Sequence, residues 1–184
     1  MNNKPFKTLT SNVVWSCPWY AVRQDKILLP NGKVGEYNTI VKETAVWILP
    51  VTAAGEIVLL RHYRYTVDDW CWEIPAGGVK PGQTVEEAAR EELREEIGGQ
   101  AQTLERLGQF YTANGICNEV GYYFLATGVS LGIAAHEPAE LMEIHPTPAA
   151  EVLRMARTGQ ITDASSALVI LLCEAYLEKM LLEY

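Results

Sequence analysis

The chain has 184 residues, of which 48% are hydrophobic, so it can form one α/β domain with a small appended element. The 15 basic and 23 acidic residues give a net charge of −8, which argues against a nucleic-acid-binding surface because such surfaces are basic. The N-terminus lacks the apolar run of a signal peptide, and no apolar run is long enough to span a bilayer. We therefore expect a cytoplasmic protein with neither nucleic-acid nor membrane partners.

The first part of the chain is predicted to be rich in β-strands. Residues 13–42 are typical of short strands, with a turn at 30–32, where Pro, Asn and Gly follow one another. Residues 1–42 therefore form a candidate subdomain, and residues 43–184 form the main domain. In the main domain, the apolar runs at 43–51 and 55–65 indicate strands.

A helix is predicted within residues 83–99, after a strand that runs into the glycine-rich loop at 71–78. Thr84 and Glu87 have the spacing of a capping box, and Gly98 is a typical helix stop. The elements expected downstream are strands at 103–112 and 120–129, a loop from 132 that leads to an edge strand, a helix at 148–158 and a last helix from Asp163 to about 182. Helices and strands are interspersed, which indicates a mixed α/β class.

The predicted helix within residues 83–99 carries six glutamates. Helical geometry places Glu92, Glu95 and Glu96 within an arc of about 100°, with Glu92 and Glu96 at the edge of the apolar stripe. Partly desolvated carboxylates must either take up protons or bind cations, and Mg²⁺ prefers such oxygen ligands. A solvated helix held by salt bridges is the alternative. The preceding loop favours a ligand site, because Gly77 lets the backbone approach a ligand closely.

The segment from Gly77 to Gly98 resembles the Nudix box, in which a glycine, a glutamate and an Arg-Glu-apolar-x-Glu-Glu-x-Gly run follow one another at fixed spacing. Glu92, Glu95 and Glu96 stand at the positions of the family's ligand glutamates. The resemblance implies a Nudix-type α/β/α sandwich with a mixed β-sheet and a β-rich N-terminal element. It also implies hydrolysis dependent on Mg²⁺ or Mn²⁺, held by these glutamates and the Ala76 carbonyl.

Two positions depart from the box: Gln83 stands where the family has glutamate, and Glu91 stands where it has arginine. The family's arginine helps to orient the ligand carboxylates. We therefore expect weaker metal binding in this chain, and a Glu91→Arg change should strengthen it.

Segments outside the box resemble the ADP-ribose pyrophosphatase branch: "RHYRY", "WEIPAGG" and "GQITDASS". The branch usually has Ser-Pro-Gly downstream of the box, whereas this chain has Ala-Asn-Gly at 113–115, with Glu119 in register. The resemblance implies hydrolysis of a nucleoside diphosphate linked to another group, with ADP-ribose giving AMP and ribose 5-phosphate. A nucleotide sugar is an alternative substrate. Gln83 and Glu91 favour a third reading, a weakly active or inactive nucleotide-binding module.

Further residues are candidates for substrate contact. Arg61 and Arg64 are three apart, so a regular strand would turn them to opposite faces, and Arg64 is the preferred phosphate ligand. Glu73 is a candidate just before the loop, and Gly77 is a candidate within it. The resemblance implies that Glu119 accepts hydrogen bonds from sugar hydroxyls and that Trp19 stacks on adenine across a homodimer interface.

The general base is expected to be a glutamate. The resemblance implies Glu140 or Glu137, on the loop that follows the core strands, and Glu95 is the alternative within the box. His136 lies in the same loop and is interpreted as a solvated side chain.

Overall fold

The computed structural model describes residues 4–136 and 139–183, which divide into two compact units. The first unit consists of the chain up to Thr44 together with the later segment Phe110–Val120. The second unit consists of Ala45–Gln109 and the chain from Gly121 onward. Sequence reasoning did not assign the 110–120 segment to the N-terminal part of the chain. Within residues 4–136 and 139–183, no helix is both long and apolar enough to cross a membrane.

The first unit is an antiparallel sheet of three strands: β1 (Lys7–Ser16), β2 (Ala21–Leu28) and β3 (Val34–Val41). The turn between β2 and β3 closes through a bond of 2.9 Å from Gly32 N–H to the Leu29 carbonyl. The 110–120 segment joins this sheet, since Ile40 pairs with Cys117 and the Lys42 N–H donates to Asn118 Oδ1. Every residue of β1 is exposed.

The second unit is built on a mixed sheet in the order β10-β5-β4-β9-β8, with β6 paired to β5 and β7 paired to β4. Its strands are β4 (Ala45–Thr52), β5 (Glu56–Arg64), β6 (Asp69–Glu73), β7 (Ala76–Gly78), β8 (Thr103–Tyr111), β9 (Val120–Val129) and β10 (Met142–Pro148). β4 runs parallel to β9 and antiparallel to β5, which makes the sheet mixed.

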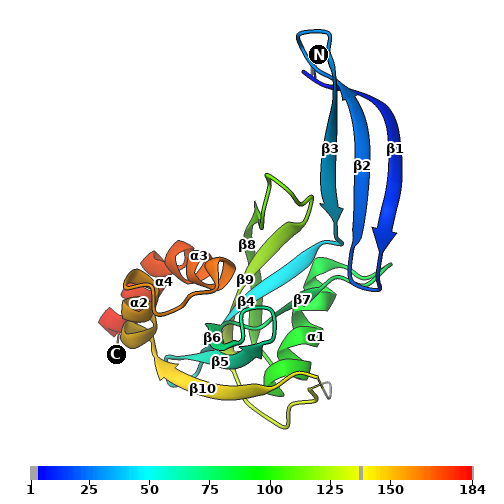
Figure 1. Cartoon of the computed structure of the whole chain (residues 1–184). Helices are drawn as coiled ribbons and strands as arrows, with labels where there is room; N and C mark the ends of the chain where they lie inside the picture. Colours follow the sequence, from blue (N-terminus) through cyan, green and yellow to red (C-terminus); the bar gives the residue numbers. More distant parts are fainter. Residues whose placement is uncertain (1–3, 137–138, 184) are drawn as a thin grey trace. The chain divides into compact units, whose positions relative to one another are not determined.

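Helices cover both faces of this sheet: α1 (Val85–Ile97) lies on one side, and α2 (Ala149–Arg157), α3 (Ala164–Leu172) and α4 (Glu174–Glu183) lie on the other (Figure 1). Alternate residues of a strand point to opposite faces. Val46 and Ile48 of β4 accordingly pack with Leu93 and Ile97 of α1 in one core cluster. The predicted α/β/α sandwich with a mixed β-sheet is confirmed.

The prediction of one last helix from Asp163 to about 182 is wrong, because the helix breaks at Cys173. Asp163 does cap the start, where its side chain accepts a hydrogen bond from Ser166 N–H. After the break, α4 buries Leu177, and its Glu174 and Glu178 form ion pairs with Arg157 of α2.

Candidate active site

The acidic helix α1 is fixed at both ends. At its start Thr84 and Glu87 form the predicted capping box, with the Thr84 N–H 2.8 Å from Glu87 Oε2. At its end Gly98 has a φ of +61°, a left-handed conformation that favours glycine. A Cβ at Gly98 would also overlap the backbone of Gly132, so the loop after β9 lies directly against the C-terminus of α1.

Glu92 and Glu96 lie one turn apart on α1, and Glu96 is only 6% exposed. Burial is the main cause that raises the pKa of Glu96 well above its ordinary value, and the neighbouring Glu92 charge is the second. Burial is also the main cause that raises the pKa of Glu92, to about 7, and the Glu95 charge is the second. Among the residues that the structure describes, neither carboxylate forms an ion pair with Lys or Arg. Both carboxylates are therefore short of positive charge.

The loop before α1 touches this carboxylate pair. Gly77 lies in β7 opposite Val46, and a Cβ on it would overlap the Glu92 carboxylate, so this close approach requires glycine. The adjacent Ala76 N–H donates to Glu96 Oε2 at 3.0 Å. The structure thus brings together Ala76, Gly77, Glu92 and Glu96 of the sequence-predicted site.

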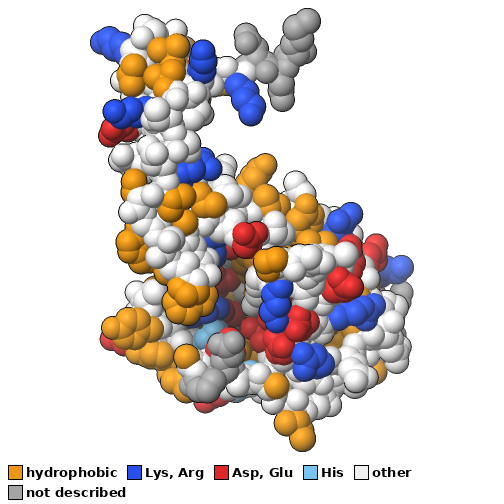
Figure 2. All heavy atoms as spheres, turned by 90° about the vertical axis from the view of Figure 1, so that its right-hand side faces the viewer, with side chains coloured by type: hydrophobic (Ala, Val, Ile, Leu, Met, Phe, Trp, Pro, Cys, Tyr) orange, Lys and Arg blue, Asp and Glu red, His pale blue; other side chains and the backbone are white. Residues whose placement is uncertain are grey.

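Oxygen ligands of this kind fit a divalent cation. Within the described part of the chain, no three Asp, Glu, His or Cys side chains are close enough to enclose a metal ion by themselves. Mg²⁺ does not need such an enclosure, because it is usually bound through one or two carboxylates plus water and substrate phosphates. Acidic side chains gather on the face that carries α1, interspersed with Lys and Arg (Figure 2).

Glu95 lies close enough to Glu92 for its charge to act on it, but it also has a partner of its own on α1. Its Oε1 is 2.9 Å from Arg94 Nη2, and about a third of its side chain (34%) is exposed. This ion pair gives Glu95 a surface partner that Glu92 and Glu96 lack.

Arg64 and Glu73 form a second charged contact, in which Glu73 is buried and Arg64 is exposed. The Arg64 guanidinium donates to both Glu73 oxygens, at 2.8 and 2.5 Å. His62 Nδ1 is 3.6 Å from Glu73 Oε2, which is beyond hydrogen-bonding distance. Burial alone would raise the pKa of Glu73, but Arg64 and His62 outweigh it and hold the pKa below its ordinary value. The Arg64 charge also acts on Glu96, so this arginine lies near the carboxylate pair.

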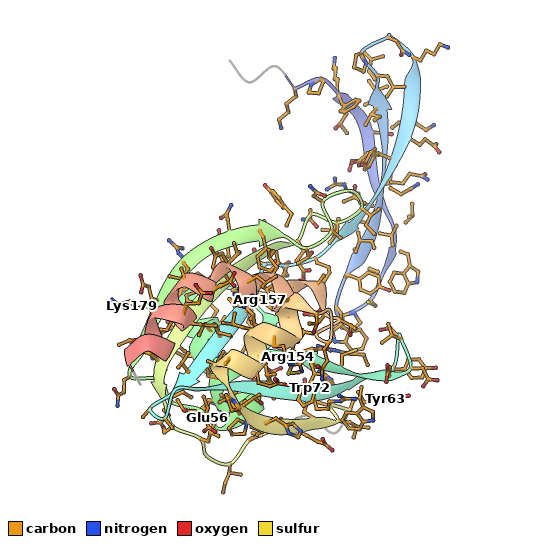
Figure 3. All side chains as sticks on the ribbon, turned by 90° about the vertical axis from the view of Figure 1, so that its left-hand side faces the viewer. Glu56, Tyr63, Trp72, Arg154, Arg157 and Lys179 are labelled. Carbon is orange, nitrogen blue, oxygen red and sulfur yellow. The ribbon has the colours of Figure 1, made fainter. Side chains whose placement is uncertain are left out.

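Arg61 takes part in different contacts, three residues before Arg64 on β5. Its guanidinium lies over the Trp72 ring, 4.9 Å from the centroid, and Trp72 in turn packs edge-on against His145. Figure 3 looks onto the side of the second unit that carries Trp72 and Tyr63. Arg61, Trp70, Trp72, Glu143 and His145 line a shallow groove there.

Glu140 lies on a loop that is anchored at both ends. Before it, the Ala135 N–H donates to the Glu95 carbonyl at 2.7 Å, and His136 Nε2 is 2.6 Å from the Glu96 carbonyl. After it, the Leu141 carbonyl accepts from Tyr63 N–H at 3.0 Å. The Glu140 charge adds to the effect of burial in raising the pKa of Glu92 and of Glu96. The other loop candidate, Glu137, lies outside the described residues.

His136 was interpreted from the sequence as a solvated side chain, and this was wrong. A carbonyl oxygen only accepts, so the histidine ring donates to the last turn of α1. A single loop histidine has no spacing signal, so the contact is seen only in the folded structure.

Two other candidates belong to the first unit. Glu119 is 6% exposed, forms an ion pair with Lys42 Nζ at 2.6 Å and accepts a hydrogen bond from Thr112 Oγ1 at 2.8 Å. Its carboxylate is therefore already neutralised by a lysine. Trp19 lies between β1 and β2 with 77% of its surface exposed.

Two protein-family models match this chain. The family model described as NUDIX domain matches residues 41–165, and the model of the nucleoside diphosphate sugar hydrolase N-terminal domain matches residues 6–40. An ADP-ribose pyrophosphatase of Bacillus subtilis is 29% identical, covering 89% of this chain and 90% of that one. An ADP-ribose pyrophosphatase of Mycobacterium tuberculosis is 32% identical, covering 89% and 81% of the two chains.

The solved structure of an ADP compounds hydrolase has the same fold, with a TM-score of 0.83 and 21% identity over 96% of both chains. The chain therefore belongs to the NUDIX family. Within that family it is a Nudix hydrolase similar to ADP-ribose pyrophosphatases.

Proposed function

We propose that the protein hydrolyses the pyrophosphate bridge of a nucleoside diphosphate linked to another group, with Mg²⁺ or Mn²⁺ as cofactor. ADP-ribose is the proposed substrate, and AMP and ribose 5-phosphate are the products. The observation that carries the proposal is the pair Glu92 and Glu96, a half-buried and a buried carboxylate with raised pKa values, of which Glu92 lies against the Gly77 backbone. The similarity to ADP-ribose pyrophosphatases of B. subtilis and M. tuberculosis supports ADP-ribose.

Glu92 and Glu96 would hold the cation, together with the Ala76 carbonyl and with Glu95 as a further ligand. A bound divalent cation neutralises the diphosphate and lowers the pKa of an attacking water. The Ala76 N–H keeps Glu96 directed toward the loop, and Gly77 leaves room for the Glu92 carboxylate. Arg64, held by Glu73, supplies a fixed positive charge for a phosphate oxygen. The Gly77 backbone is a further substrate contact.

Glu140 is the proposed general base. It would take a proton from the attacking water while oxygen adds to one phosphorus and the bridging P–O bond breaks. Its charge already acts on both Glu92 and Glu96, and its loop is anchored at both ends. Glu95 remains the alternative, although its ion pair with Arg94 turns it toward the surface.

The proposal is tested by incubating the purified protein with ADP-ribose, other nucleoside diphosphate compounds and Mg²⁺, and identifying the products. We expect AMP and ribose 5-phosphate from ADP-ribose and no turnover after exhaustive chelation. Undiminished turnover after chelation would contradict the metal-dependent mechanism.

A nucleotide sugar is the second candidate substrate. The match of residues 6–40 to the N-terminal domain of nucleoside diphosphate sugar hydrolases supports it. Trp19 for base stacking and Glu119 for a sugar hydroxyl are proposed contacts for either substrate. Comparing kcat/KM for ADP-ribose with that for ADP-glucose and UDP-glucose distinguishes the two.

We further propose that the protein is a homodimer that uses the β-rich N-terminal part, residues 1–42. Val13, Val14 and Trp15 of β1 are each at least half exposed, at 62%, 56% and 50%. An exposed apolar run of this kind favours contact with another protein surface. Sedimentation at micromolar concentration should give about twice the mass of the 20.5 kDa chain. A single 20.5 kDa species would contradict the dimer.

A further inference from the structure

The two residues that depart from the Nudix box are hydrogen-bonded to each other. Gln83 Nε2 donates to Glu91 Oε2 at 2.6 Å. The other oxygen of this carboxylate, Oε1, is 3.1 Å from Lys80 Nζ and 3.9 Å from Arg94 Nη2. Glu91 is therefore held in place by the loop and is not a loose surface carboxylate.

Gln83 fits this place because a side-chain amide has a donor at one end and an acceptor at the other. Its Oε1 accepts from Lys80 N–H at 3.0 Å, while its Nε2 faces Glu91. A glutamate at position 83 would set two carboxylates against each other. An arginine at position 91 would instead face the amide NH₂ of Gln83 and the ammonium of Lys80. Each departure is thus unfavourable alone and favourable with the other.

In both arrangements a positive charge offsets the carboxylate. In the family the glutamate at 83 is paired with the arginine at 91. Here Gln83 is neutral, and Lys80 is the cation paired with Glu91. The difference is that the positive charge lies on the loop, three residues after Gly77, rather than on α1.

We infer that Lys80, Gln83 and Glu91 form a loop-to-helix clamp that replaces the family's glutamate–arginine pair, with Lys80 as the positioning residue that supplies its positive charge. The clamp joins the loop that carries Gly77 to the α1 residue immediately before Glu92. It therefore holds the Gly77 backbone against the Glu92 carboxylate. This inference rests on the proposed cation-dependent function, and it reverses the expectation that Glu91→Arg alone strengthens metal binding.

A four-protein cycle tests the clamp: wild type, Gln83→Glu, Glu91→Arg and the double variant. One readout is the thermal midpoint in the presence of a chelator. The second is Mn²⁺ affinity without substrate, measured from the paramagnetic resonance signal of the free ion. Each single change should lower the midpoint by about 2–4 °C. Each should also weaken Mn²⁺ binding about tenfold, as loss of an outer-shell partner does.

The double variant should recover both quantities, to within about twofold in Mn²⁺ affinity, because a glutamate at 83 and an arginine at 91 restore a pair of opposite charges. Additive effects, or a Glu91→Arg protein that binds Mn²⁺ as tightly as wild type, would overturn the inference. A wild-type protein that binds no Mn²⁺ and hydrolyses nothing contradicts the proposed function instead. The thermal midpoints in chelator still decide whether the clamp exists.

Lys80 is tested separately. Lys80→Gln should weaken Mn²⁺ binding by about the same tenfold factor, and Lys80→Arg should retain affinity because it keeps the charge. Lys179→Gln is the matched control, since this lysine lies exposed on α4 (Figure 3). Equal Mn²⁺ affinity in Lys80→Gln and Lys179→Gln would remove Lys80 from the clamp.

Discussion

Two glutamates of the second unit are equally buried but have opposite electrostatic surroundings. Glu73 and Glu96 are each 6% exposed. Glu73 accepts two hydrogen bonds from the Arg64 guanidinium, whereas Glu96 accepts one backbone N–H and lies beside the Glu92 carboxylate. Despite burial, the pKa of Glu73 is lowered, while burial and Glu92 raise that of Glu96.

The difference shows that the charged partner, rather than burial, decides whether a buried carboxylate is neutralised within the fold or left able to bind a cation. A carboxylate paired with arginine is neutralised within the fold, and so is Glu119 with Lys42 in the first unit. Glu92 and Glu96 are left with a shortage of positive charge, which costs stability in the metal-free protein. Groups with such perturbed pKa values concentrate at functional sites. Changes to the two kinds of carboxylate should therefore have opposite consequences for stability and activity.

Glu96→Gln should abolish most activity without unfolding the protein. Gln keeps the size of the side chain but removes a negative cation ligand, so kcat should fall by roughly 10²–10⁴-fold. In chelator the same variant should be at least as stable as wild type, because it removes a buried like-charge contact. Wild-type kcat at saturating Mg²⁺ would exclude Glu96 from the site.

Glu73→Gln should have the opposite effect on stability. It leaves Arg64 without its carboxylate partner, so the free energy of unfolding should fall by about 1–3 kcal/mol. Urea unfolding in chelator, run in parallel with Glu96→Gln, gives the comparison. If both variants change stability in the same direction, the contrast between paired and unpaired carboxylates is wrong.

Stability of the metal-free protein should fall as the pH rises from 5 to 8. The folded-state pKa of Glu92 is about 7 and that of Glu96 is also raised, so the folded state retains protons that the unfolded state has released. Their contribution is present below the ordinary pKa of glutamate and is lost as pH rises through the folded values. We expect the thermal midpoint to drop on the order of 2–6 °C.

Mg²⁺ should reverse this drop at pH 8, because a cation binds the ionised pair. The Glu92→Gln, Glu96→Gln double variant is the control, and its midpoint should be nearly flat between pH 5 and 8. A wild-type midpoint that rises over this range would contradict the direction of both pKa shifts.

The sequence predicted α1 well, because its caps and apolar stripe are local features. Thr84 with Glu87, and Gly98, mark its ends from a few residues alone. The break at Cys173 escaped prediction because residues 164–183 contain no Gly or Pro that would mark a helix end. For Gln83 and Glu91, the spacing of the Nudix box identified both residues as departures from the family pattern. Only the fold shows that they contact each other and that Glu91 contacts Lys80.

The smallest expected effect concerns His136, which anchors the loop of Glu140 to the end of α1. His136→Ala removes one of the two hydrogen bonds from this loop to the Glu95 and Glu96 carbonyls. A slightly misplaced base slows the reaction, so kcat should fall by roughly 3–10-fold, with little change in Mn²⁺ affinity. His136→Gln, whose amide nitrogen has a similar reach, should recover part of the loss.

The Glu140→Gln variant provides the background in which to test whether His136 acts by positioning Glu140. If the histidine acts by positioning this base, His136→Ala should have no further effect on kcat once the base is gone. If the two losses instead multiply, His136 acts on the carboxylate pair of α1 directly, and the loop is not the means by which it contributes.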